Sequence, residues 1–126
     1  MIKLMIADDY SIIRKRIRNI LADEPDMEVT CEAGNGTEVF ELLKLHEVDI
    51  VVLDFNMPEM SGLEILTQLR ISYPCIPVLM LTGHSEGMYE RKTISAGASG
   101  FISKESAQEE LAVMIRKISA EKVLKY

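Results

Sequence analysis

Residues 48–62 read VDIVVLDFNMPEMSG, and this stretch decides the fold class of the chain. It begins with an apolar, β-branched run at 50–53, which is followed at once by the carboxylate of Asp54. A run that is apolar at consecutive positions fits a strand buried on both faces, as in parallel sheets covered by helices. In open α/β sheets the ligand site lies just beyond the carboxyl ends of the strands. Asp54 is therefore expected at a functional site, although a single Asp there could also merely cap a loop.

Strand and helix signals alternate along the rest of the chain. Apolar runs predict strands at 2–7, 27–33, 50–53, 76–81 and 100–103. Apolar residues with helical spacing predict helices around 13–21, over 37–46, from 63 to about 72, over 85–96, and after Ser106. A Ser-x-x-Glu capping box at Ser106 and Glu109 is expected to open the last helix, and residues 119–126 carry no further signal. Five strand–helix units predict right-handed βαβ crossovers and one parallel sheet with helices on both faces.

Length and charge narrow the possible functions. The chain has 126 residues, 48% of them hydrophobic, which is enough for one domain with a core. Its formal net charge of −6 argues against nucleic-acid binding by this domain alone, because such binding needs a basic surface. No apolar run approaches the ~20 residues that span a bilayer, and acidic residues come too early for a signal peptide. We therefore expect a cytoplasmic location and no contact with membranes.

Charged and hydroxyl side chains follow the predicted strands where each one ends. Asp8 and Asp9 follow the first strand, Asp54 the third, Thr82 the fourth and Lys104 the fifth. Three carboxylates at one edge of a sheet repel one another, so a proton or a cation must sit among them. Oxygen ligands without nearby Cys or His favour Mg²⁺. The pattern therefore predicts a magnesium site.

The same residues suit phosphoryl transfer. A carboxylate beside Mg²⁺ can attack phosphorus, which would leave an aspartyl phosphate on Asp54. Lys104 would neutralise one phosphoryl oxygen, and the Thr82 hydroxyl would donate a hydrogen bond to another. Such chemistry needs little beyond positioning and charge.

Four segments of the chain resemble the receiver domain of two-component response regulators. They are Ala7-Asp8-Asp9, Leu53-Asp54 together with 57–62 (MPEMSG), Leu81-Thr82, and 97–104 (GASGFISK). Any one of them is weak, but the ordered set is specific and spans essentially the whole chain. The first and last segments look most like the NarL/FixJ-type transcriptional regulators, in which a helix-turn-helix domain normally follows the receiver.

The resemblance implies a three-layer, flavodoxin-like (βα)5 fold. Its five-stranded parallel sheet would have the strand order 2-1-3-4-5, numbered along the chain. Residues 1–120 would form the receiver domain, and 121–126 a C-terminal tail or the start of a linker to an output domain. The output itself would be transcriptional, with DNA bound through that further domain.

The resemblance also implies roles for individual residues. Asp54 would accept the phosphoryl group from a histidine kinase, a phosphotransfer protein or a small phosphodonor. Mg²⁺ would be bound by Asp9 directly, by Asp8 mainly through water, by Asp54, and by the backbone carbonyl of Asn56. Such a domain assists its own phosphorylation and slow dephosphorylation but is not a turnover enzyme.

A conformational switch is implied at Thr82 and Phe101. The hydroxyl of Thr82 would move toward the phosphoryl group, and the ring of Phe101 would follow inward. Phe101 stands where many members have Tyr, so no phenolic hydrogen bond can contribute, and an ordinary packed core ring is the alternative. The face built from helix 85–96, strand 100–103 and the last helix would then change its partner preference, with a homodimer as one outcome.

Other functions fit the residues less well. A receiver that works only through protein contacts, without phosphorylation, usually lacks an acidic residue, the Thr or the Lys, and this chain retains all of them. A phosphatase of the haloacid-dehalogenase kind expects Asp-x-Asp after its first strand, whereas Asp8 and Asp9 are adjacent. A flavin-binding flavodoxin expects a Ser/Thr-rich phosphate loop there, and none is present.

Overall fold

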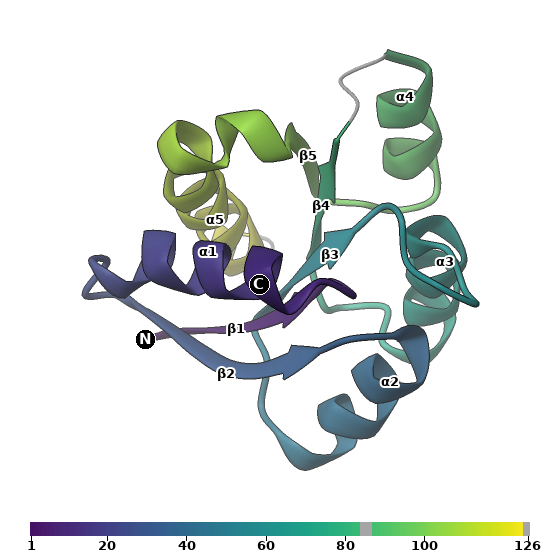
Figure 1. Cartoon of the computed structure of the whole chain (residues 1–126), viewed down its shortest axis with the longest axis horizontal. Coiled ribbons are helices and arrows are strands. Elements are labelled where there is room, and N and C mark those ends of the chain that lie inside the picture. Colours follow the sequence, from purple (N-terminus) through teal and green to yellow (C-terminus); the bar gives the residue numbers. More distant parts are fainter. Residues whose placement is uncertain (84–86, 125–126) are drawn as a thin grey trace.

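The computed structural model describes the backbone of residues 1–83 and 87–124, and the side chains of these residues except 87–90 and 123–124. The strands are β1 (Ile2–Ala7), β2 (Met27–Ala33), β3 (Ile50–Asp54), β4 (Val78–Thr82) and β5 (Gly100–Ser103). They form one five-stranded sheet in the order β2-β1-β3-β4-β5, and all neighbouring pairs are parallel (Figure 1). The predicted fold class and strand order are therefore confirmed.

Helices cover both faces of this sheet (Figure 1). They are α1 (Ser11–Ala22), α2 (Gly36–Leu45), α3 (Gly62–Ser72), α4 (Gly87–Ser95) and α5 (Ala107–Leu124), with a short 3-10 turn, η1 (Lys104–Ser106), before α5. The helices α1 and α5 lie on one face, and α2, α3 and α4 lie on the other (Figure 1). None of the described helices is both long enough and apolar enough to cross a membrane.

The sheet divides the apolar core into two layers. Leu4 and Ile6 of β1 pack toward α1 and α5, whereas Met5 and Ala7 pack toward α2 and α3. This alternation follows from the two-residue period of a strand. Every residue of β3 is buried, as expected for a central parallel strand with helices on both sides. The buried layers fix the strand ends, and therefore the side chains that follow them.

The end of the chain differs from the sequence-based expectation. Residues 119–126 were expected to carry no element, yet α5 continues to Leu124. The added turns rest on residues of high intrinsic helix propensity, including Ala120, Glu121 and Lys122. The apolar stripe ends at Ile118, so periodicity alone placed the helix end too early.

The start of α5 differs as well. The Ser103 side chain accepts a hydrogen bond from the Ser106 amide at 3.3 Å, and its hydroxyl donates to Ser106 Oγ at 3.0 Å. Ser103 therefore caps the 3-10 turn η1, in place of the predicted capping box of Ser106 with Glu109. Within the predicted helix 85–96, the first two residues lie outside the described part of the chain.

Candidate functional site

The carboxyl ends of four strands place the candidate side chains at one edge of the sheet. Asp54 and Thr82 are the last residues of β3 and β4, while Asp8 and Lys104 directly follow β1 and β5. Asp8 and Thr82 are 0% exposed and Asp54 is 1% exposed. Polar groups buried this deeply need partners or a bound ion, since their desolvation is otherwise unfavourable.

An acidic cluster occupies this edge. Asp8, Asp9 and Asp54 can each offer a carboxylate oxygen so that all of these atoms lie within 4.8 Å of one another. One oxygen on each side chain is buried and makes no hydrogen bond within the described part of the chain, namely Asp8 Oδ2, Asp9 Oδ1 and Asp54 Oδ2. Oxygen ligands of this kind suit a hard divalent cation such as Mg²⁺. The residues therefore fit the ion that the sequence pattern implies.

Lys104 supplies the positive charge next to this cluster. Its Nζ lies 3.0 Å from Asp54 Oδ1 and 3.4 Å from Asp8 Oδ2. Burial alone would lower the pKa of Lys104, but the hydrogen bond to Asp54 and the negative charges of Asp54 and Asp8 outweigh it, and the net pKa is raised. Lys104 therefore stays protonated and can meet a further anionic group at this position.

Asp54 has an unusual protonation equilibrium. Burial raises its pKa to about 6, and the negative charge of Asp8 adds to the rise. The hydrogen bond to Lys104 and the amide of Asn56, which donates to Asp54 Oδ1 at 3.3 Å, offset part of the rise. A buried carboxylate with so few partners binds a proton or a cation readily.

Local structure fixes both acidic segments. The Asp8 amide donates to the Ala33 carbonyl at 3.0 Å, and Asp8 Oδ1 accepts a hydrogen bond from the Tyr10 amide at 2.9 Å. On the other side, Gly62 opens α3 directly against the end of β3. A Cβ atom at Gly62 would lie 2.3 Å from the carbonyl oxygen of Asp54, so the close approach requires glycine.

The two candidate switch residues lie on neighbouring strands and face the same side of the sheet. Phe101 pairs with Met80, and Thr82 lies two residues beyond Met80 on β4. Phe101 is half-buried and packs against the layer formed with α2 and α3. The geometry allows a coupled movement, and the switch itself remains a prediction.

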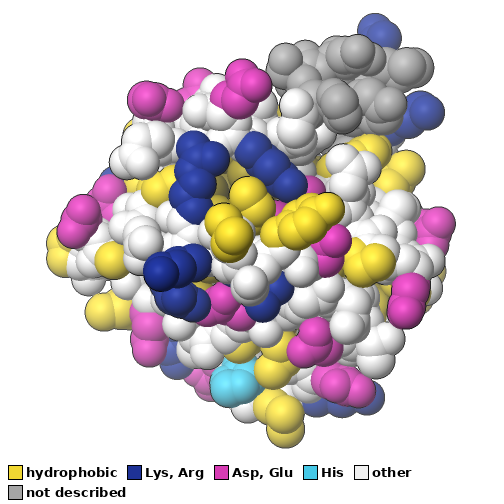
Figure 2. Space-filling model, viewed as in Figure 1, with side chains coloured by type: hydrophobic (Ala, Val, Ile, Leu, Met, Phe, Trp, Pro, Cys, Tyr) yellow, Lys and Arg dark blue, Asp and Glu magenta, His cyan; other side chains and the backbone are white. Residues whose placement is uncertain are grey.

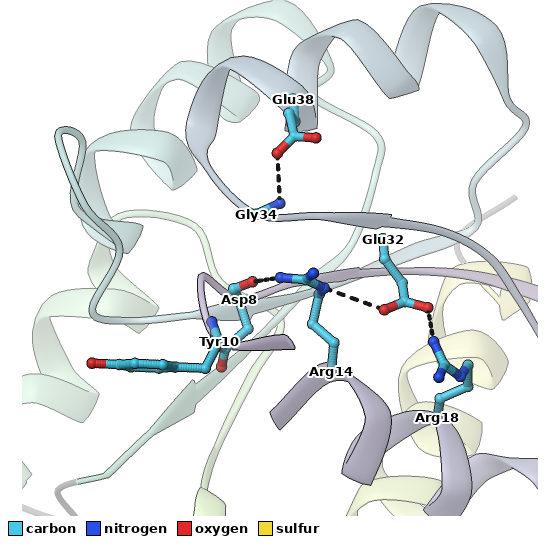
Figure 3. Close-up of polar contacts among 7 residues, drawn as sticks. All are labelled: Asp8, Tyr10, Arg14, Arg18, Glu32, Gly34 and Glu38. Carbon is cyan, nitrogen blue, oxygen red and sulfur yellow. Dashed lines mark hydrogen bonds and ion pairs between the residues drawn. The ribbon is translucent and has the colours of Figure 1, made fainter. Parts of the chain in front are cut away.

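Sequence reasoning missed a contact between α1 and the acidic segment. The guanidinium of Arg14 donates a hydrogen bond to the backbone carbonyl of Asp8 at 2.6 Å (Figure 3). Arg14 belongs to a cluster of four basic residues at 14–18 of α1, a pattern that is typical of an ordinary solvated helix face. The cluster also included Arg18, which contacts Glu32 and not Asp8. Nothing in the spacing of these arginines distinguishes one from the other.

Residues 4–116 match the family described as the response regulator receiver domain. The chain belongs to this family. The resemblance that the motifs indicated is therefore confirmed, and the domain is a receiver of a two-component system. The acidic cluster is the group that could hold the Mg²⁺ which receiver domains generally bind.

The receiver resembles a part of several curated response regulators, at most 60% of the length of each. It is 34% identical to the response regulator UvrY of Escherichia coli (strain K12) over 94% of this chain and 54% of that protein. It is also 34% identical to the nitrate/nitrite response regulator protein NarP of the same strain, over 98% of this chain and 60% of that protein. The chain thus spans 50% to 60% of the length of such curated relatives.

Solved receiver structures share the fold closely. A two-component response regulator of the LuxR family from Aurantimonas sp. SI85-9A1 superposes with a TM-score of 0.90 at 31% identity, over 94% of this chain and 85% of that chain. The receiver domain of the putative response regulator NarL from Mycobacterium tuberculosis gives 0.85 at 27% identity, over 94% and 96%. These likenesses support the flavodoxin-like receiver architecture.

Proposed function

We propose that this receiver is a phosphorylation switch in which Asp54 is the phosphoacceptor. The observation that carries the proposal is the buried Asp54 carboxylate, paired with Lys104 at 3.0 Å and clustered with two further carboxylates. A purely structural ion pair between Lys104 and Asp54 would not need two further carboxylates beside it, because the repulsion among the three acids is unfavourable without an added cation. The arrangement suits a site that gains its full set of partners only with Mg²⁺ and a phosphoryl group.

The acidic residues would bind the Mg²⁺ ion jointly. Asp9 would bind Mg²⁺ directly, Asp8 mainly through water, and Asp54 and the backbone carbonyl of Asn56 would complete the protein ligands. When bound, the ion supplies positive charge that neutralises the phosphoryl oxygens and the attacking carboxylate. One buried oxygen on each of Asp8, Asp9 and Asp54 makes no hydrogen bond within the described part of the chain, which supports this assignment.

The transfer step follows from the side chains at the strand ends. A carboxylate oxygen of Asp54 attacks phosphorus on a phosphohistidine donor, and the nitrogen–phosphorus bond breaks. The imidazole nitrogen keeps the electron pair and takes a proton. Lys104 and the Thr82 hydroxyl hold the phosphoryl oxygens that remain. Water slowly reverses the modification, so the domain is a switch and not a turnover enzyme.

The conformational response would run from Thr82 to Phe101. Movement of the Thr82 hydroxyl toward the phosphoryl group leaves space that the half-buried ring of Phe101 enters. Because both side chains face the same side of the sheet, the two movements can be coupled. The conformational equilibrium of the face formed by α4, β5 and α5 then shifts toward the active conformation.

Partners follow from the family and the relatives. Receiver domains take phosphoryl groups from histidine kinases, phosphotransfer proteins or small phosphodonors, and we propose the same here, in the cytoplasm. A further relative, 31% identical over 94% of this chain and 50% of its own length, is named the transcriptional regulatory protein DegU of Brevibacillus brevis, which supports a transcriptional output through a DNA-binding segment beyond this receiver. Phosphorylation would favour a homodimer through the α4, β5 and α5 face.

A mass measurement tests the central assignment. The intact protein is incubated with Mg²⁺ and acetyl phosphate, beside Asp54→Asn and Asp23→Asn, a matched loss of an exposed carboxylate. We expect one phosphoryl adduct that requires Mg²⁺, survives acid and is lost in base, present in Asp23→Asn and absent in Asp54→Asn. If Mg²⁺ binds but no adduct forms, the domain is instead a receiver that acts through protein contacts alone.

A further inference from the structure

A hydrogen bond from α1 reaches the backbone between the two acidic residues that follow β1. Arg14 Nη1 lies 2.6 Å from the carbonyl oxygen of Asp8 (Figure 3). That oxygen belongs to the peptide unit that joins Asp8 to Asp9. Because a peptide unit is planar, its orientation sets the direction in which the next residue leaves the strand end. The guanidinium thus acts on the backbone of both acidic residues and not on their carboxylates.

The edge strand β2 holds the other side of this guanidinium. Arg14 Nε lies 3.2 Å from Glu32 Oε1. Glu32 also accepts a hydrogen bond from Arg18, one turn further along α1 (Figure 3). The side chains of Arg14 and Glu32 are 21% and 25% exposed, so their pairing is shielded more than a surface ion pair would be. Arg14 is therefore held by β2 as well as by the Asp8 carbonyl.

The next residue of β2 completes the arrangement. Ala33 accepts a hydrogen bond from the Asp8 amide at 3.0 Å, so β2 holds Asp8 directly by its amide and, through Arg14, by its carbonyl. A Cβ atom at Gly34 would lie 3.6 Å from Arg14 Nη1, which shows that the following turn passes close over the guanidinium. The peptide groups before and after Asp8 are thus both held by hydrogen bonds.

We propose that Arg14 is a positioning residue for the magnesium site. These hydrogen bonds hold the peptide between Asp8 and Asp9 so that both carboxylates point into the acidic cluster despite their mutual repulsion. The inference rests on the proposed function, because it concerns the affinity of the same cluster for Mg²⁺. Glu32 acts through Arg14, and neither side chain touches the reacting atoms.

The charge of Arg14 makes the test directional. A positive charge near a cation site opposes Mg²⁺ binding, so an arginine that acted only by its charge would weaken the affinity. Its replacement by a neutral residue would then tighten Mg²⁺ binding. A positioning role has the opposite consequence, because the loss of a group that orients a ligand typically weakens metal affinity by roughly 10- to 100-fold.

Arg18 provides the matched control. Arg14→Met and Arg18→Met each remove one positive charge from α1 and one contact to Glu32, but only Arg14 reaches the Asp8 carbonyl. Mg²⁺ affinity is measured by isothermal titration calorimetry on the unphosphorylated full chain. We expect about tenfold weaker binding in Arg14→Met and an affinity equal to or tighter than wild type in Arg18→Met. Equal or tighter binding in Arg14→Met would overturn the proposal.

A spectroscopic readout separates positioning from general loosening of the fold. The Asp9 amide belongs to the same peptide unit as the Asp8 carbonyl, so its ¹⁵N resonance is expected to shift in Arg14→Met and not in Arg18→Met. Arg14→Lys can still donate one hydrogen bond and is expected to recover part of the Mg²⁺ affinity. If Arg14→Met fails to fold, Arg14→Lys decides, since wild-type affinity in that variant contradicts a need for two simultaneous contacts.

The wild-type chain distinguishes this inference from the proposed function. If wild type binds Mg²⁺ and Asp54 is phosphorylated, but Arg14→Met binds Mg²⁺ equally well, only the positioning role fails. If wild type binds no Mg²⁺, both proposals fail together.

Discussion

Lys104 and Asp54 form an ion pair of 3.0 Å in which the carboxylate is 1% exposed and the lysine side chain 22% exposed. The pair joins β5 to the end of β3 across the intervening strand β4. Since the lysine also lies 3.4 Å from Asp8, one ammonium group serves two carboxylates. The balance between this single charge and the buried acids determines how the site responds to pH, ions and mutation.

Replacement of Lys104 by Met should slow phosphorylation of Asp54 strongly. One donor to a developing phosphoryl anion is lost, and removal of such a group typically lowers a rate by about 10²-fold or more. The pKa of Asp54 should also rise above about 6, because its largest stabilising partner is gone. Adduct formation followed by mass at saturating Mg²⁺ measures the rate, and an unchanged rate would show that Lys104 does not assist phosphoryl transfer.

Stability without Mg²⁺ should fall as pH rises from about 4 to about 6. The folded pKa of Asp54 is about 6, above the value of about 3.9 in an unfolded chain. The folded state therefore binds more protons in this window, and its free energy of unfolding decreases with pH.

Asp54→Asn should remove this dependence on pH. It should be more stable than wild type at pH 7.5, by at most about 3 kcal/mol from the two-unit shift, and similar to wild type near pH 4. Urea unfolding in the presence of a chelator measures the difference. A variant that is less stable than wild type at pH 7.5 would contradict the buried-charge argument.

Mg²⁺ should stabilise the wild-type fold and have little effect on Asp9→Asn. An ion that binds only the folded state adds about 2.7 kcal/mol to the free energy of unfolding at 100 times its dissociation constant. Asp9 contributes one of the buried unpaired oxygens, so its loss should abolish most of that increase. Thermal unfolding in calcium-free buffer, with and without Mg²⁺, provides the comparison. Equal increases in melting temperature for both proteins would place the ion elsewhere.

Gly62→Ala should destabilise the domain by about 1–3 kcal/mol, as overpacking of a tight contact does. The added Cβ would lie 2.3 Å from the Asp54 carbonyl oxygen and 2.8 Å from the Phe55 Cα, and backbone atoms cannot rotate away. Gly83→Ala is the matched control, because a Cβ there meets nothing within 4 Å. Urea midpoints should separate the two variants clearly. The displaced end of β3 should also slow Asp54 phosphorylation in Gly62→Ala.

Much of the fold was predictable because the buried parallel strands appear in the sequence as runs of consecutive apolar residues. The run at 50–53 is apolar throughout, since β3 has a helix layer on each side. The end of the last helix was harder to predict, because its apolar stripe stops at Ile118 while the helix continues through Ala120, Glu121 and Lys122, which have high helix propensity. The sequence did not predict the 3-10 turn that Ser103 caps. Ser106 and Glu109 have the spacing of a capping box, and this spacing gives no sign that a 3-10 turn precedes the helix.

The acidic side chains of the candidate site could be located from sequence because each follows a recognisable strand. Their convergence then required only the rule that carboxyl ends of parallel strands meet at one edge. Arg14 could not be located in this way. Its contact depends on how α1 crosses β1 and β2, so that one guanidinium reaches both Glu32 and a backbone carbonyl. A solvent-exposed arginine and an arginine that contacts the backbone of a neighbouring strand can occupy the same sequence positions of an amphipathic helix.

One exposed face near α1 carries basic and apolar side chains together (Figure 2). Lys and Arg side chains lie beside exposed hydrophobic ones on the face shown in Figure 2. Ile12 of α1 is 79% exposed and, with Lys15 and Arg16, borders a surface pocket. The same helix therefore carries both the contact of Arg14 with the Asp8 backbone and an accessible mixed surface.

The continuation of α5 to Leu124 has a consequence for protein engineering. A helix advances about 1.5 Å and turns about 100° for each residue. A reporter or effector fused in helical register after Leu124 would thus be aimed by the phase of α5. Insertion of single residues at that junction should change the output periodically with about 3.6 residues per cycle, so junction length becomes an angular control.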